Sequence, residues 1–183
     1  MAEVKVLIEG YTSVEKQGKT ASTISLVRDK EIVMVVDPGV TKAQDILDAL
    51  KKEGLAKEDV NFVFITHSHI DHYKNMGIFP RAKILEYFGI WEEDKEEIQW
   101  KEDFTPNIKI LKTPGHDYSS LTLLVKSKEG IIAICGDVFW KENFPEKDQY
   151  ASDEGKLKES RKIILKKADY IIPGHGKMFK VKK

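Results

Sequence analysis

The five histidines of this 183-residue chain all stand directly after a strand-like run or in the turn that follows one. Three of them, His67, His69 and His72, lie within one short segment, and His116 and His175 each follow a Pro-Gly pair. Strand ends and the loops after them are where α/β folds place their sites. The shared position of all five indicates one functional site rather than five unrelated surface residues.

The residue types and their spacing predict a metal site. His67 and His69 are two residues apart, so both rings can project to the same side of an extended chain, and imidazole nitrogens suit a borderline cation such as Zn²⁺. Asp71 and His72 follow in a tight turn and can bind a second cation beside the first. Asp137, at the end of another apolar run, is the candidate carboxylate shared between two cations ~3.5–4 Å apart.

The rest of the chain alternates strand-like and helix-like runs. Residues 41–53 and 155–168 have apolar side chains at helical spacing and predict two amphipathic helices, each covering one face of a sheet. The order of elements predicts an α/β fold with much antiparallel pairing. The predicted strands are 4–9, 23–28, 31–36, 61–66, 82–86, 108–112, 121–126, 131–135 and 170–172.

Four connecting or terminal segments remain. We expect residues 10–22 and 139–155 to form walls of the site, residues 91–103 to be a solvated helix or loop, and the basic residues 177–183 to be a solvated end. The aromatic residues of the second wall have two interpretations: they form an apolar mouth, or they pin a long loop to the core. These residues are Phe139, Trp140, Phe144 and Tyr150.

Composition restricts the class of protein. Lys and Arg together number 30, as do Asp and Glu, so the balanced charge does not support nucleic acid as a partner. The single cysteine, Cys135, forms no disulfide within the chain and is expected in the core.

The first ten residues do not resemble a signal peptide, and no run approaches the ~18 apolar residues of a membrane span. We therefore expect a cytoplasmic protein without membrane contacts, folded as one domain over residues 1–183, with a small-molecule substrate. The oligomeric state stays undetermined.

The order His67-x-His69-x-Asp71-His72, then His116, Asp137 and His175, resembles the metallo-β-lactamase superfamily, more narrowly a minimal single-domain member of its glyoxalase II-like branch. The resemblance extends over nearly the whole chain and implies a four-layer αββα sandwich with the site at one edge of the sheets. The true β-lactamases often have a cysteine in place of Asp137, so an antibiotic-degrading role is not expected.

The resemblance also implies a role for each residue. Two divalent metal ions are expected, Zn²⁺ first and Fe or Mn as alternatives. Asp37 is expected to support the site without binding metal. The implied ligands are His67, His69 and His116 for the first metal and Asp71, His72 and His175 for the second, with Asp137 bridging.

The predicted activity is hydrolysis of an ester, thioester, lactone or phosphodiester bond by a hydroxide that bridges the metals, with Asp71 as the catalytic residue that orients the water and moves a proton. Two alternatives stay open. One is a sulfur dioxygenase of the same superfamily with a single iron on His67, His116 and Asp137. The other is a metal-binding module without catalysis.

Overall fold

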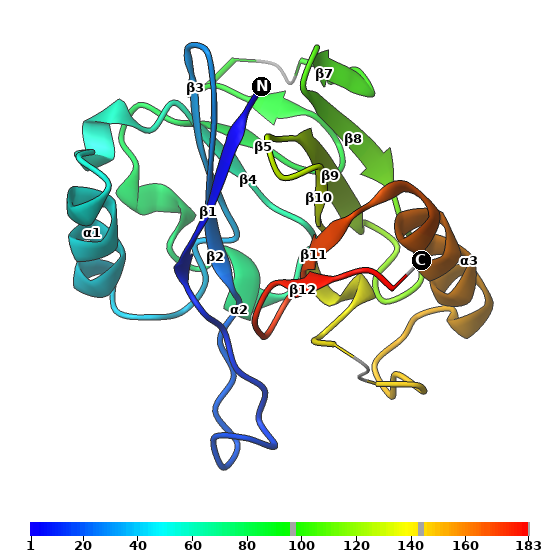
Figure 1. Ribbon diagram of the computed structural model, residues 1–183. Helices are drawn as coiled ribbons and strands as arrows, with labels where there is room; N and C mark the ends of the chain where they lie inside the picture. Colours follow the sequence, from blue (N-terminus) through cyan, green and yellow to red (C-terminus); the bar gives the residue numbers. More distant parts are fainter. Residues whose placement is uncertain (96–97, 143–144, 183) are drawn as a thin grey trace.

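Two mixed six-stranded sheets form the centre of the protein (Figure 1). The computed structural model describes residues 1–95, 98–142 and 145–182. The first sheet has the order β1 (Glu3–Ile8), β2 (Ile24–Asp29), β3 (Ile32–Val36), β4 (Phe62–Phe64), β5 (Lys83–Leu85), β6 (Ile90–Trp91). The second has the order β12 (Phe179–Lys180), β11 (Tyr170–Ile172), β10 (Ile131–Ile134), β9 (Leu121–Lys126), β8 (Ile108–Lys112), β7 (Asp103–Thr105).

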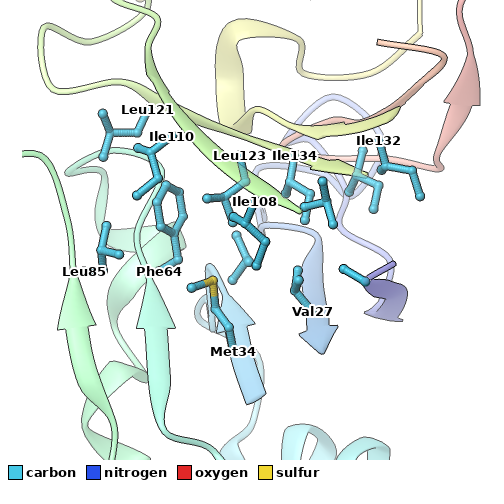
Figure 2. Close-up of a cluster of buried hydrophobic side chains, with 14 residues drawn as sticks. Val27, Met34, Phe64, Leu85, Ile108, Ile110, Leu121, Leu123, Ile132 and Ile134 are labelled. Carbon is cyan, nitrogen blue, oxygen red and sulfur yellow. The ribbon is translucent and has the colours of Figure 1, made fainter. Parts of the chain in front are cut away.

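The main core lies between the two sheets. Alternate residues of each strand point to opposite faces, so Met34 and Val36 of β3 enter this core while Val35 between them faces outward. Figure 2 shows side chains of the first sheet, such as Phe64 and Leu85, packed against those of the second, such as Leu123. Burying each such side chain contributes about 1.5–3 kcal/mol to folding.

A helix covers the outer face of each sheet, which completes an αββα sandwich. Helix α1 (Ala43–Lys52) buries Ile46 and Leu50 against the first sheet. Helix α3 (Glu154–Lys167) buries Leu157 and Ile164 against the second. The side chain of Asp153 accepts a hydrogen bond from the backbone N–H of Lys156 (3.0 Å), which caps the first turn of α3. The four layers confirm the predicted fold class.

Parallel pairing brings the site segments to one edge. Strand β3 pairs in parallel with β4, and β10 with β11, and each pair is linked through a helix, α1 or α3. The carboxyl ends of parallel strands meet at the same edge of a sheet. Asp37, His67, Asp137 and His175 all lie in segments that follow one of these four strands.

The predicted elements are confirmed with small shifts at their ends, and three short strands were missed. Strand β12 contradicts the prediction of a solvated basic end, because Phe179 pairs with Ile171 and Val181 is buried. Within the predicted surface segment 91–103, Trp91 belongs to β6, Ile98 forms a bridge with Ile90, and residues 96–97 lie outside the described part. The missed strands β6, β7 and β12 have only two or three residues each, which is too little alternation to be recognised in a sequence.

No helix within the described ranges has the length and apolar character needed to cross a membrane.

Cys135 is buried beneath α3, as expected, and burial raises the pKa of its thiol. We predict that the native protein does not react with a thiol reagent such as 5,5′-dithiobis(2-nitrobenzoate) at pH 8, because the reactive thiolate is disfavoured and inaccessible. The same reagent is expected to label one thiol per chain after unfolding in guanidinium chloride. Rapid labelling of the native protein would show that this part of the core opens.

Candidate metal centre

Three histidine nitrogens from two loops converge at the edge of the sandwich. His69 Nδ1 lies 3.0 Å from His67 Nε2 and 3.0 Å from His116 Nε2. Nitrogens bound tetrahedrally to one Zn²⁺ at 2.0–2.1 Å are about 3.3 Å apart, so this spacing is close to that of a shared cation. The first predicted ligand set is therefore assembled, although His67 and His116 are 49 positions apart in the chain.

A second group of donors adjoins the first. Asp71, His72 and His175 have ligand atoms close enough to share an ion, and Asp137 groups with the three histidines of the first set. The carboxylate of Asp137 faces both groups: Oδ2 is 3.5 Å from His116 Nε2, and Oδ1 is 3.4 Å from His72 Nε2 and 3.2 Å from His175 Nε2. The geometry thus brings all seven predicted residues together, with Asp137 between the two sets.

Two buried atoms at this point have no hydrogen-bond partner. His72 Nε2 and Asp137 Oδ1 are both inaccessible to solvent and form no hydrogen bond, although they lie 3.4 Å from each other. A buried polar atom without a partner costs about 1–3 kcal/mol, so such atoms usually mark a ligand or ion. Imidazole nitrogens and carboxylate oxygens are donors that bind divalent transition metals. The donor set and its unpaired atoms therefore fit two such cations.

Electrostatics prepares three of these groups, His67, His69 and Asp137, for metal binding. Burial, followed by the neighbouring His72, holds the pKa of His67 well below its usual value, and burial with His116 lowers the pKa of His69. Both imidazoles are therefore neutral and keep a free lone pair. Burial works against ionisation of Asp137, but His175 and His72 hold its pKa well below the usual range, so the carboxylate is anionic. For His72 and His175 burial works against protonation, but the neighbouring carboxylates raise the pKa of both rings, Asp37 and Asp137 for His72 and Asp137 for His175.

Hydrogen bonds orient the rings through their other nitrogens. Asp37, buried and in a left-handed conformation (φ 48°), has its Oδ2 2.8 Å from His72 Nδ1. The same carboxylate accepts from the backbone N–H and the hydroxyl of Thr66, and the Thr66 oxygen lies 3.1 Å from His67 Nδ1. His175 Nδ1 donates to the carbonyl oxygen of Ala21 (2.9 Å). In each ring Nε2 is thereby left to face the site, the arrangement typical of metal-binding histidines.

Asp148 is a supporting residue that sequence reasoning missed. Its buried Oδ2 lies 2.6 Å from His116 Nδ1 and accepts from Trp140 Nε1 (3.2 Å), while Oδ1 accepts from the backbone N–H of Tyr150 (2.9 Å). It therefore ties the loop 139–155 to a candidate ligand. Its sequence context is charged and loop-like, and resembles a surface segment, so no local signal distinguishes it.

Replacing Asp148 is expected to weaken the first metal position. Asp148→Asn keeps the shape but removes the charge that holds the His116 Nδ1–H, and loss of such a partner lowers metal affinity about 10–100-fold. The affinity is measured by competition between the protein and a chromogenic chelator for Zn²⁺. Asp117→Asn is the matched control, because Asp117 adjoins His116 but its side chain accepts from Ser119 in a turn. Equal affinities in both variants would contradict the role of Asp148.

The two predicted wall segments line a cavity of about 310 Å³ over the donors. Thr12, Ser13 and Thr20 come from the first segment, and Trp140 and Tyr150 come from the second. Phe139 does not line this cavity and packs against Phe179 beside α3, as expected if it pins the loop to the core. Phe144 lies outside the described residues.

Two glycines explain why the main chain can approach the donors so closely. Gly136 has a φ of 50°, and a side chain there would collide with Thr66. A Cβ on Gly174 would overlap the Asp137 carboxylate. The glycines beside Asp137 and His175 therefore serve the site geometry.

Comparison with known proteins agrees with the fold. A family model described as the metallo-beta-lactamase superfamily matches residues 18–109, half of the chain. A Xenopus laevis protein named metallo-beta-lactamase domain-containing protein 1 is 32% identical, over 97% of this chain and 81% of its own length. The chain belongs to the metallo-beta-lactamase superfamily.

More distant relatives and solved structures match as well. An N-acyl homoserine lactonase of Bacillus cereus is 24% identical, over 75% of this chain and 64% of its own length. The crystal structure of a Thermotoga maritima protein described as a metallo-beta-lactamase has a TM-score of 0.76 at 21% identity and covers 98% of this chain and 99% of its own. The chain spans 59% of the human metallo-beta-lactamase domain-containing protein 1 and 49% of a Caenorhabditis elegans relative.

Proposed function

We propose that this chain is a binuclear metal-dependent hydrolase that cleaves an ester, thioester or lactone bond in a small molecule. The observation that carries the proposal is the position of the buried Asp137 carboxylate between two adjoining donor groups. Its Oδ1 atom has no hydrogen-bond partner. His67, His69 and His116 would hold one divalent cation, and Asp71, His72 and His175 the other. Two cations bound in this way would supply Lewis acidity and lower the pKa of a bound water.

Asp71 is the residue that we propose acts on water and substrate. It lines the cavity, and its Oδ2 accepts a hydrogen bond from the Thr20 hydroxyl (3.1 Å) and lies 3.7 Å from His175 Nε2. Thr20 thereby orients the carboxylate, which can hold an attacking water by hydrogen bonding and pass its proton to the leaving group.

The cavity favours catalysis over a purely structural metal site. A structural zinc site is closed by four protein ligands. Here seven donors would serve two positions, and one side opens to a cavity lined by hydroxyl and aromatic side chains. We infer that residues 1–183 act as one domain, because both sheets build one core and contribute donors to the same edge.

The choice of bond follows from the relatives. The Bacillus cereus relative is named an N-acyl homoserine lactonase, and a solved lactone hydrolase (TM-score 0.65, 20% identity) holds the product N-hexanoyl-L-homoserine at its catalytic metal centre. Zinc is the proposed metal. The glyoxalase II-like branch and the cytoplasmic location stay predictions.

One experiment tests the proposal. Metal content is measured on protein prepared with zinc, iron and manganese available, together with rates on p-nitrophenyl acetate, N-hexanoyl homoserine lactone, an acyl thioester and bis(p-nitrophenyl) phosphate. Two zinc ions per chain and cleavage of an ester, thioester or lactone are expected. One iron per chain with oxygen uptake on a persulfide would instead support the dioxygenase alternative, and a metal-loaded but inert protein would support the non-catalytic one.

A further inference from the structure

A second cavity, of about 390 Å³, lies beside the metal centre and is apolar. Its size falls in the range of small-molecule sites, about 300–1,000 Å³. Its walls come from α2 (Ile70–Tyr73), the turn after it, the β5–β6 turn and the loop after His116. The apolar and aromatic residues that line it are Ile65, Tyr73, Met76, Ile84, Tyr87, Phe88, Trp91 and Tyr118.

The one charged side chain of this lining is already engaged. The carboxylate of Glu86 accepts hydrogen bonds from the backbone N–H groups of Phe88 (3.1 Å) and Gly89 (3.2 Å) and from Trp91 Nε1 (2.7 Å). Glu86 therefore shapes the β5–β6 turn and holds the Trp91 ring in place. A ligand in this cavity meets aromatic and aliphatic surface, so the cavity suits a neutral, apolar group.

The polar end of the cavity borders the metal centre. His67 and Ser68 line the apolar cavity, while His69, the next residue, lines the cavity over the donors. Ser68 Oγ and Ser119 Oγ lie 3.2 Å apart and join the two loops at this boundary. Because neighbouring residues of one segment line the two cavities, a substrate that occupied both would pass the two serines.

Several large apolar side chains of the lining are exposed. Phe88 is 52%, Trp91 42% and Tyr118 59% accessible, and the rings of Tyr87 and Tyr118 pack edge to face at 5.9 Å. Exposed apolar side chains gathered at one place usually mark a binding site. Their position at the rim of a cavity next to the metal centre favours substrate over a protein partner.

We propose that this cavity binds an apolar acyl chain of the substrate, whose carbonyl group is presented to the metal centre. The inference rests on the proposed hydrolase function and narrows its substrates to those that carry such a chain. Medium-chain esters are therefore cleaved with a lower KM than acetate esters.

The test compares p-nitrophenyl acetate with p-nitrophenyl octanoate. The wild-type KM for octanoate is expected to be at least about 10-fold lower than that for acetate, because a single additional methylene in an apolar pocket is already worth about 10-fold. Phe88→Ala is expected to raise the KM for octanoate far more than the KM for acetate, and Phe88→Leu to restore most of the preference. The control is Ile163→Ala, since Ile163 is a partly exposed apolar residue on α3 and lines neither cavity.

Calorimetric titration of the metal-loaded protein with 1-octanol gives a readout that does not need turnover. Binding to wild type and weaker binding to Phe88→Ala support the cavity even if no ester is cleaved, in which case the hydrolase proposal alone fails. Ester cleavage without chain preference and without octanol binding overturns the cavity inference alone. Light scattering measures the oligomeric state as a third readout. If the wild-type protein is a dimer and Phe88→Ala is a monomer, a second copy of the chain covers the cavity. That result also overturns the inference.

Discussion

The His69→Ala variant is expected to lose metal from the first position and nearly all hydrolytic activity. His69 Nδ1 is the atom that lies within 3.0 Å of both other histidine nitrogens of the first group, so its removal leaves two ligands and Asp137. Loss of a residue that only hydrogen-bonds to a ligand lowers metal affinity about 10–100-fold. Loss of a ligand itself is expected to lower the affinity by a larger factor. Metal content after dialysis and kcat/KM on the best ester of the panel are the measurements.

Ile70→Ala is the matched control for this variant, because Ile70 is the next residue and its side chain is largely exposed. It should retain two metal ions and bind zinc normally. The His69→Ala protein should also remain folded, since His69 is only partly buried and lies outside the hydrophobic core. Full metal content and activity in His69→Ala would defeat the assignment of the first group.

The Asp71→Asn variant is expected to keep the first metal ion but to lose turnover by about 10²–10⁴-fold, the usual contribution of a positioned acid–base group. Asparagine has the same shape, and its side-chain oxygen can still accept from Thr20, so the loop geometry is maintained. The amide cannot take up a proton as the carboxylate does, and it binds cations less strongly. Single-turnover rates and metal content separate these two effects.

Asp45→Asn serves as the control for this substitution, because Asp45 is an exposed aspartate in the first turn of α1, far from the site in the chain. Its rate and metal content should equal those of wild type. If Asp71→Asn turned over at the wild-type rate with both metals bound, Asp71 could not be the residue that handles the proton.

The candidate ligands could be predicted because their signal is local. His67, His69 and His72 stand within six residues of sequence, and His116 and His175 each follow a Pro-Gly turn after an apolar strand. The two helices and the long strands were likewise visible as periodic apolar patterns, since each buries one face. The short edge strands β6, β7 and β12 carry no such pattern, because pairing with a neighbouring strand rather than their own residues makes them extended.

The partners of the ligands could not be predicted. Asp148 lies 32 positions from His116, and Thr20 lies 51 positions from Asp71. Both stand in polar loops where an aspartate or a threonine is ordinary. Only the packing of those loops against the sheet edge makes them part of the site.

The sequence by itself determined an α/β class of fold and the seven candidate donors, because residue type and short-range spacing are read directly from the chain, whereas the four-layer sandwich and the grouping of the donors were expectations implied by the family resemblance. The tertiary structure decided how the donors meet around Asp137, which side chains orient their rings and where an apolar cavity opens beside them. Those features depend on contacts between segments far apart in the chain, which are made only when both sheets and their loops pack together. Such contacts have no counterpart in local sequence.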